Sequence, residues 1–343
     1  MEYCSLGRSG LKVSRLCLGT GNFGTGGAEK ANWGTVGEKE AFEIMDAALD
    51  LGINFFDTAN VYGGVGHRGY TEGIIGRWFA QGGSRREKTV LATKVGRVME
   101  EDDTDGPNKP QGLSLYKIRR HFEASLRRLQ TDHVELLQMH KVDRSVSWDE
   151  LWEAFEGLVW QGKLDYVGSS NSAALDIMKA QSVARDRQFM GLVSEQTRYD
   201  LLGRLAELEV IPAVLDQGIG LTIFSPLVRG LLGINVLEPI LRPLSDTARR
   251  HLERCRPQLT AFSELCRDLG EKEANVALAW TLSCEAVASV IIGPCSVVDL
   301  QELMRAVELR LDDETRSRLD DIFPGPGVFS TGLNEKLRWE RGQ

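Results

Sequence analysis

The sequence has little of what several classes of protein need. Its six cysteines include no C-x-x-C pair and no histidine at ligand spacing, which argues against both a metal site and a disulfide framework. The formal net charge is −8, so the chain offers no basic surface for nucleic acid or an anionic membrane. No apolar run reaches membrane-spanning length, and residues 1–16 lack the apolar core of a signal peptide. We therefore expect a soluble cytoplasmic protein without metal, nucleic-acid or membrane partners.

The chain does have enough apolar content for a sizeable core, because 42% of its 343 residues are hydrophobic. Short apolar runs alternate with segments of helical periodicity, of which the clearest lie at 38–52, 115–130, 148–162 and 273–284. The apolar runs number eight and lie at residues 16–19, 53–57, 89–95, 134–140, 164–170, 191–196, 220–226 and 288–293. Eight strand-helix repeats predict an α/β protein with a closed (β/α)8 barrel, in one domain over residues 1–343.

An open, doubly wound sheet is the alternative to the barrel. Such a sheet usually ends after fewer strands and carries a glycine-rich phosphate loop directly after its first strand. Residues 19–27, GTGNFGTGG, are rich in glycine but lack the Lys-Ser/Thr of a P-loop and lead into no helix. This pattern favours a barrel with a flexible loop at this position.

A hairpin and three long loops stand outside the repeat. The first 16 residues predict two short strands around a turn at Arg8-Ser9-Gly10. Residues 20–37, 96–112 and 228–246 each follow a predicted strand. Barrel enzymes build their sites from the loops after the strands. The three loops are therefore expected to form the substrate walls.

Three further segments leave alternatives open. The acidic run from Glu100 to Asp105 favours a solvated loop over a cation site. Residues 324–343 are a C-terminal tail that either folds over the barrel mouth or extends freely. Residues 231–240 are either an oligomer contact or the inner side of a loop, so a monomer and a homo-oligomer are both compatible with the sequence.

Four polar side chains follow three successive predicted strands. Asp57 ends one strand and Tyr62 comes shortly after it, while Lys94 and His140 end the next two. The carboxyl ends of barrel strands meet at one face, so we expect these side chains to be neighbours. A buried lysine favours phenolate, which predicts a tyrosine pKa lowered toward working pH. The set then fits proton delivery to a carbonyl, with Asp57 keeping Lys94 charged and His140 donating to the carbonyl oxygen.

Each of the four residues also has a structural interpretation. An aspartate at a strand end is often a helix cap, a tyrosine before glycines often only packs, and a lone histidine is more often structural than catalytic. Taken one at a time, these structural interpretations are the better ones. The coincidence of all four types at one predicted face favours an active site.

Seven motifs over nearly the whole chain resemble the aldo-keto reductase superfamily. They are FFDTANVYG, VLATKVG, LLQMH, YVGSSN, SEQTRYD, FSPLVRG and VIIG, in this order. The resemblance implies a barrel that binds NADP in an extended form and transfers hydride to an aldehyde or ketone. By the same resemblance Tyr62 is the acid, Lys94 and Asp57 tune it, and His140 orients the substrate carbonyl.

The resemblance also implies the cofactor contacts. It assigns the nicotinamide carboxamide to Ser170, Asn171 and Gln196, and ring stacking to Phe224, where tyrosine or tryptophan is commoner in the family. The other matching positions are Gly19, Thr20 and Asp57 at strand ends, Ser225, Pro226, Leu227, Arg229 and Gly230 over the pyrophosphate, and Gly293 at the adenosine end.

The sequence departs from the family at the adenosine end. Cys295 stands where relatives often carry an arginine or lysine for the 2'-phosphate, and Leu303 stands where many carry an asparagine. Ser296, Asp299 and Glu302 remain as contacts for this end of the cofactor. NADP is the expected cofactor, and NAD stays open as an alternative.

A finer resemblance concerns the substrate. The opening MEY and the late DDIFPGPG are similar to bacterial deoxysugar reductases, which implies a nucleotide-linked keto sugar as substrate. Arg97 and Arg229 are candidate partners for its diphosphate. The alternative function is a cofactor-binding regulatory subunit resembling the channel-associated β subunits of the same superfamily. Such subunits keep the four polar residues, so the motifs do not separate the two functions.

Overall fold

The structure is a computed structural model that describes residues 1–25, 35–63, 66–99, 108, 112–238 and 246–326. Eight parallel strands close into a barrel in the order β10-β3-β4-β5-β6-β7-β8-β9. Their bounds are Leu16–Gly19 (β3), Phe55–Asp57 (β4), Val90–Val95 (β5), Val134–Met139 (β6), Leu164–Ser170 (β7), Leu192–Thr197 (β8), Gly220–Ile223 (β9) and Val287–Ile292 (β10). The predicted (β/α)8 barrel is confirmed.

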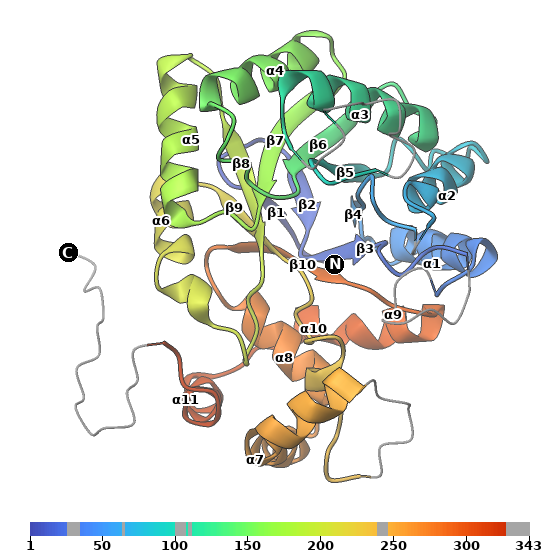
Figure 1. Ribbon diagram of the computed structural model, residues 1–343. Helices are drawn as coiled ribbons and strands as arrows, with labels where there is room; N and C mark the ends of the chain where they lie inside the picture. Colours follow the sequence, from blue (N-terminus) through green and yellow to red (C-terminus); the bar gives the residue numbers. More distant parts are fainter. Residues whose placement is uncertain (26–34, 64–65, 100–107, 109–111, 239–245, 327–343) are drawn as a thin grey trace.

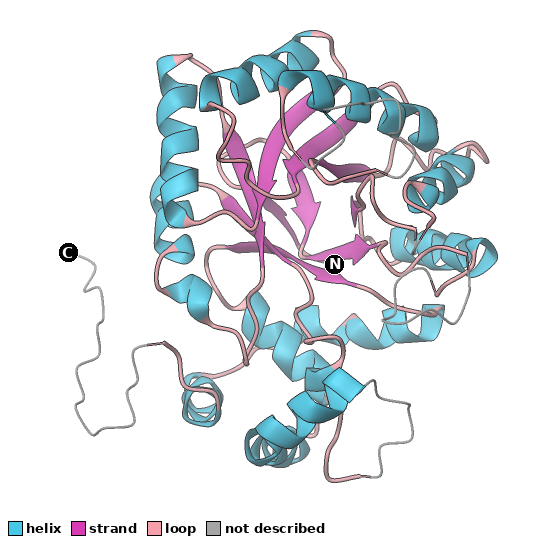
Figure 2. Ribbon diagram, viewed as in Figure 1, coloured by secondary structure: helices cyan, strands magenta, loops and turns pink. Residues whose placement is uncertain are grey.

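Helices surround the strands, as Figure 2 shows. Those that connect consecutive barrel strands are Glu38–Asp50 (α1), Tyr70–Phe79 (α2), Leu115–Leu129 (α3), Trp148–Trp160 (α4), Ala174–Asp186 (α5), Val210–Gln217 (α6) and Glu273–Leu282 (α8). The four segments with the clearest helical periodicity are α1, α3, α4 and α8. Their apolar positions pack inward on the barrel, which is what the periodicity predicts.

Additional helices lie after β9 and β10. Asp246–Leu269 (α7) precedes α8, and Asp313–Ile322 (α11) ends the described chain; both lie outside the ring in Figure 1. Shorter helices there are Val297–Leu303 (α9), Arg305–Glu308 (α10) and Leu231–Gly233 (η3), and Leu205–Glu207 (η2) lies between β8 and α6. No helix in the described ranges combines the length and the apolar character that crossing a membrane requires.

Two apolar cores lie on the two sides of the barrel wall. Phe56 points outward into the core between strands and helices, where its ring stacks on Trp78 at a centroid distance of 5.6 Å. Phe55 points inward and belongs to a smaller core inside the barrel. This alternation follows from the period of two along a strand. It explains why the apolar run that leads to Asp57 is continuous and not alternating.

The predicted hairpin closes the bottom of the barrel. Tyr3–Ser5 (β1) pairs antiparallel with Lys12–Ser14 (β2). Leu6 and Val13 of this hairpin are fully buried in the inner core. The end of the barrel where the strands begin is therefore filled with side chains, and the opposite end is left for a site.

The sequence left the interpretation of three segments open, and the structure describes only one of them in part. The acidic run from Glu100 to Asp105 lies outside the described residues, as does the tail from residue 327. Leu231, Leu232 and Ile234 are buried in the helix-side core, so the described start of 231–240 is the inner side of a loop.

Candidate active site

The four polar residues of the strand ends meet at the open face of the barrel. The Lys94 ammonium lies 2.6 Å from Asp57 Oδ2, 3.1 Å from Tyr62 Oη and 2.9 Å from the Thr58 carbonyl oxygen. The rings of Tyr62 and His140 lie edge to face at 6.0 Å. We call Asp57, Tyr62, Lys94 and His140 the tetrad. The structure brings all four together, as the strand pattern predicts.

Lys94 is a fully buried cation with three hydrogen-bond partners. Burial by itself lowers the pKa of this amine, but Asp57 and Tyr62 outweigh it and raise the pKa above its ordinary value. The lysine is therefore charged at neutral pH, and Asp57 keeps it so, as the sequence predicted.

The prediction for Tyr62 was wrong in sign. Burial raises the pKa of the phenol, and this outweighs the attraction of Lys94, which lowers it. The charge on Asp57 opposes the lysine as well. Tyr62 therefore keeps its proton at neutral pH, which is the state that a proton donor requires. The role of Lys94 is then to stabilise the phenolate that forms when the proton leaves.

His140 is a neutral imidazole. Burial, and then the charges of Lys94 and Arg97, hold its pKa well below the ordinary value. A neutral imidazole carries one N–H, so it serves as a hydrogen-bond donor and not as an acid. Its Nδ1 has no hydrogen-bond partner among the described residues.

Gln138 belongs to the site, although it was not predicted from the sequence. Its Nε2 donates to Asp57 Oδ1 at 3.0 Å, next to Gln196 Nε2, which donates to the same oxygen at 2.8 Å. Gln196 Nε2 also lies 3.2 Å from Gln138 Oε1. With Lys94 on Oδ2, both oxygens of Asp57 are bonded. The signal was present in LLQMH, since a residue two positions before His140 lies on the same side of the strand.

The predicted carboxamide contacts lie at the ends of β7 and β8. Ser170 and Gln196 are buried and paired in the strand ladder. Asn171 adopts a left-handed backbone with φ of 58°, and its N–H donates to the Gln196 carbonyl at 3.0 Å. Its side chain donates to Ser170 Oγ at 2.9 Å. The three residues thus form one hydrogen-bonded group beside the tetrad. Asn171 Nδ2 also lies 3.5 Å from the backbone carbonyl oxygen of His140.

The loop after β9 has a strained backbone. Ser225, Val228 and Arg229 have positive φ values of 51°, 50° and 56°, and Gly230 follows with 83°. Left-handed non-glycine residues are costly and cluster at ligand-binding sites. Phe224 precedes them, half-buried against the inner core. Of the other positions assigned here, Pro226 is buried, Leu227 is half-buried, and Arg229 is exposed with no bond to any described residue.

Gly19 and Thr20 support Asp57 from the neighbouring strand. Gly19 is in register with Asp57, and a Cβ on Gly19 would come within 2.6 Å of the Ile291 side chain. The Thr20 N–H and hydroxyl both donate to the Asp57 carbonyl at 3.0 Å. These two residues therefore fix the strand end that carries the carboxylate.

The polar groups of the β10–α9 segment, residues 293–303, bond within the segment or to Asn22 and Lys272. Ser296 caps α9 by accepting the Asp299 N–H at 3.1 Å, and Asp299 Oδ2 accepts the Cys295 N–H at 3.1 Å. Glu302 pairs with Lys272 at 2.9 Å, and Cys295 is exposed. Leu303 packs on the helix-side core, and a Cβ on Gly293 would meet only open space. The structure does not bring these residues to the tetrad.

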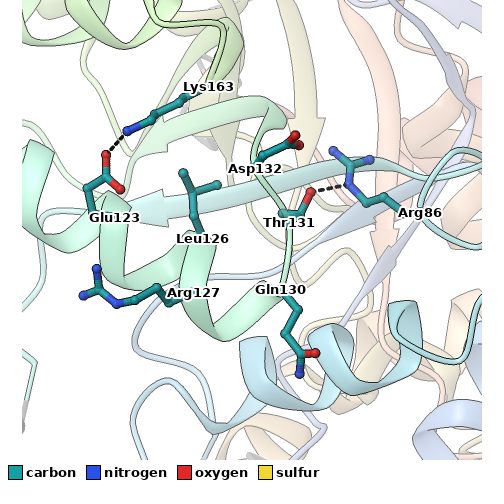
Figure 3. Close-up of a pocket in the computed structure, with 8 residues that line it drawn as sticks. All are labelled: Arg86, Glu123, Leu126, Arg127, Gln130, Thr131, Asp132 and Lys163. Atoms are coloured by element: carbon teal, nitrogen blue, oxygen red, sulfur yellow. Dashed lines mark hydrogen bonds and ion pairs between the residues drawn. The ribbon is translucent and has the colours of Figure 1, made fainter.

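A surface pocket of about 670 Å³ lies at the other end of the barrel. Figure 3 shows its eight lining residues, which are Arg86, Glu123, Leu126, Arg127, Gln130, Thr131, Asp132 and Lys163. Several of them stand just before β5, β6 and β7 begin. Lys163 pairs with Glu123, and Arg86 bonds Thr131. This pocket is separate from the tetrad.

Known proteins resemble this chain over nearly its whole length. It is 57% identical to "Uncharacterized oxidoreductase YrpG" of Bacillus subtilis, over 95% of this chain and 97% of that protein. It is 30% identical to "Versiconal hemiacetal acetate reductase" of Aspergillus parasiticus, over 94% and 97% of the two chains. It is 32% identical to "Probable voltage-gated potassium channel subunit beta" of Arabidopsis thaliana, over 90% and 92%. The model of the aldo/keto reductase family matches residues 15–323, and the chain belongs to that family.

Proposed function

We propose that this protein is an NADP-dependent reductase of aldehydes or ketones, in which the tetrad is the active site. The observation that carries the proposal is the Lys94 ammonium, which contacts both Asp57 and the hydroxyl of Tyr62. A cation fixed beside a protonated phenol stabilises the phenolate that proton donation leaves behind. Membership of the aldo/keto reductase family supports carbonyl reduction as the reaction.

The residues at the open face fit a nicotinamide cofactor. Ser170, Asn171 and Gln196 offer amide and hydroxyl groups that match a carboxamide, and the half-buried ring of Phe224 offers a stacking surface. The strained backbone from Ser225 to Gly230 fits a loop shaped to hold an anion. When bound, the reduced nicotinamide supplies the hydride.

The chain's own groups handle the oxygen of the carbonyl. His140 donates its N–H to that oxygen and orients the carbonyl. Tyr62 then gives its hydroxyl proton to the oxygen as the carbon–oxygen double bond becomes single, which leaves an alcohol and a phenolate. Lys94 balances the phenolate, and Asp57 holds Lys94 in place.

We propose NADP as the cofactor because the superfamily resemblance implies it. Cys295 offers no charge for a 2'-phosphate, so a titration with NADPH and NADH side by side is the deciding experiment. Quenching of the fluorescence of the seven tryptophans reports both affinities. Tighter binding of NADPH supports the proposal, and equal or tighter binding of NADH overturns the NADP assignment.

For the substrate we propose a carbonyl compound with an anionic group, such as a nucleotide-linked keto sugar. Arg97 stands two residues after β5, is exposed, and makes no bond to any described residue. Its positive charge lowers the pKa of both Tyr62 and His140, but contributes less to these pKa shifts than burial and Lys94 do. A guanidinium so placed is available to a phosphate or carboxylate of the substrate.

The variant Arg97→Gln tests this substrate class. The expected result is a fall of about tenfold in kcat/KM for a nucleotide-linked keto sugar, with no change for a neutral aldehyde, because only the charged substrate loses an ionic hydrogen bond. Equal effects on both substrates would show that Arg97 does not select for charge.

A regulatory subunit is the second candidate, because several similar proteins carry the name of potassium channel β subunits. The two functions differ in turnover. A regulatory subunit is expected to oxidise its bound NADPH once and then stop, whereas a reductase continues through many equivalents.

A further inference from the structure

Glu195 is a fully buried carboxyl that the proposed mechanism does not use. It lies on β8 directly before Gln196, so its side chain points to the opposite side of the strand. Ser169 Oγ donates to its Oε2, and the Ser172 N–H donates to its Oε1 at 3.0 Å. Both carboxyl oxygens are therefore bonded to the neighbouring β7 and the turn that follows it.

The two residues bonded to Glu195 flank the proposed carboxamide contacts in the sequence. Ser169 precedes Ser170 and Asn171, and Ser172 follows them. Asn171 holds the left-handed conformation in the middle of the turn, and its N–H is bonded to the Gln196 carbonyl. The turn is thus attached to β8 at Ser169, Asn171 and Ser172, and the bonds from Ser169 and Ser172 go to the carboxyl of Glu195.

Glu195 has no cation among its hydrogen-bond or ion-pair partners in the described part of the chain. On α5, Asp176 is bonded to Arg144, and Lys179 is exposed. Beyond β8, Arg198 pairs with Asp200. Burial therefore raises the pKa of Glu195 to about 7, although the bonds from Ser169 and Ser172 act in the opposite direction.

We infer that Glu195 is a positioning residue that fixes the Ser169–Ser172 turn for the cofactor carboxamide, and that its protonation weakens cofactor binding. This rests on the proposed function. The ionised carboxylate accepts both bonds, and bonds to a charged acceptor are about twice as strong as neutral ones. A protonated carboxyl carries its own hydrogen on one oxygen, so the Ser169 hydroxyl loses a charged acceptor.

The test is the dissociation constant of NADPH between pH 5.5 and 8.5, measured by tryptophan fluorescence. Wild-type protein is expected to lose about fivefold in affinity as pH falls through about 7. Glu195→Gln, whose neutral amide has nearly the shape of the carboxyl, should bind NADPH about fivefold more weakly at pH 8.5 and lack this transition. Titration of the NADPH phosphate itself affects both proteins equally, so the difference between the two profiles isolates Glu195.

Three further measurements make the test specific. At saturating NADPH, kcat of Glu195→Gln should equal that of wild type, which general damage to the site would not allow. Ser169→Ala keeps the carboxyl but removes a bond to its charged form, so the transition should move to higher pH. Glu314→Gln, an exposed residue of α11, should keep the wild-type profile.

Two results would overturn the inference. Parallel profiles for wild type and Glu195→Gln, or an unmoved transition in Ser169→Ala, would reject the role of Glu195 and leave the proposed reductase intact. Failure of wild type to bind either nicotinamide cofactor at any pH would reject both proposals together.

Discussion

Polar side chains at the ends of β4, β5, β6 and β8 bond to one another across the barrel, whereas Ser296 and Asp299 bond within the β10–α9 segment. Asp57 is contacted by Lys94, Gln138 and Gln196, which come from three other strands. Ser296 instead caps α9, and Asp299 accepts the Cys295 N–H just before that helix. Parallel strands hold their ends in fixed register, so residues distant in sequence can form a buried network there.

The two regions differ in how strongly their polar contacts depend on the barrel. The tetrad region is buried and tightly bonded, so a single substitution leaves a buried group without its partner. The β10–α9 segment is at the surface, where Cys295 is exposed and a substitution adds or removes one contact. We therefore expect large effects at the first region and small ones at the second.

The largest effect is expected for Tyr62→Phe. This variant keeps the ring but removes the proton donor, so kcat should fall by about 10² to 10⁴. NADPH affinity should not change, because the hydroxyl is not among the proposed cofactor contacts. The measurement is steady-state aldehyde reduction together with NADPH titration. Unchanged turnover would remove Tyr62 from the mechanism.

Asp57→Asn should destabilise the fold by about 3 to 5 kcal/mol, since it leaves Lys94 buried without its counter-charge. In wild type the pKa of Lys94 is raised, so its charge stabilises the fold up to about pH 10.5 and this stabilisation is lost at higher pH. In the variant burial dominates and the pKa falls. Stability of the variant should then increase from pH 7 to 10.

Urea unfolding at several pH values measures this effect. Asp186→Asn, an exposed residue at the end of α5, is the control and should behave like wild type. A variant Asp57→Asn with wild-type stability and no pH dependence would mean that Asp57 does not hold Lys94 charged.

Gln138→Leu should have a smaller effect. It removes one of two amide donors to Asp57 Oδ1, which costs about 1 to 2 kcal/mol of stability. Gln196 still bonds the same oxygen, so kcat should fall only a few-fold. Urea unfolding and steady-state kinetics measure both, with the exposed Gln161→Leu as control. Identical results for the two variants would exclude Gln138 from the network.

The smallest effect is expected in the β10–α9 segment. Cys295→Arg adds an exposed cation, and exposed charge pairs contribute about 0.2 to 1 kcal/mol. NADPH should bind up to about fivefold more tightly, and NADH affinity should be unchanged because NADH lacks the 2'-phosphate. An equal gain for both cofactors would show that this position does not face the phosphate.

The sequence predicted the parts that depend on periodicity. All eight barrel strands, the hairpin and four helices follow from apolar spacing, and the tetrad follows from the meeting of strand ends. The sign of the Tyr62 pKa does not follow, because it depends on a balance between burial and Lys94 that only the packed structure defines. Gln138 was overlooked although it stands two residues before His140, and Glu195 was overlooked because its side chain points away from the tetrad.

The central claim is that this chain reduces a carbonyl repeatedly, with Tyr62 as proton donor. The most direct measurement is the amount of alcohol formed and NADPH consumed per protein molecule when substrate is in excess. We predict equal amounts of both, far above one equivalent per protein, and almost none with Tyr62→Phe over the same time. A single equivalent of oxidised cofactor, or continued turnover by Tyr62→Phe, would contradict this account.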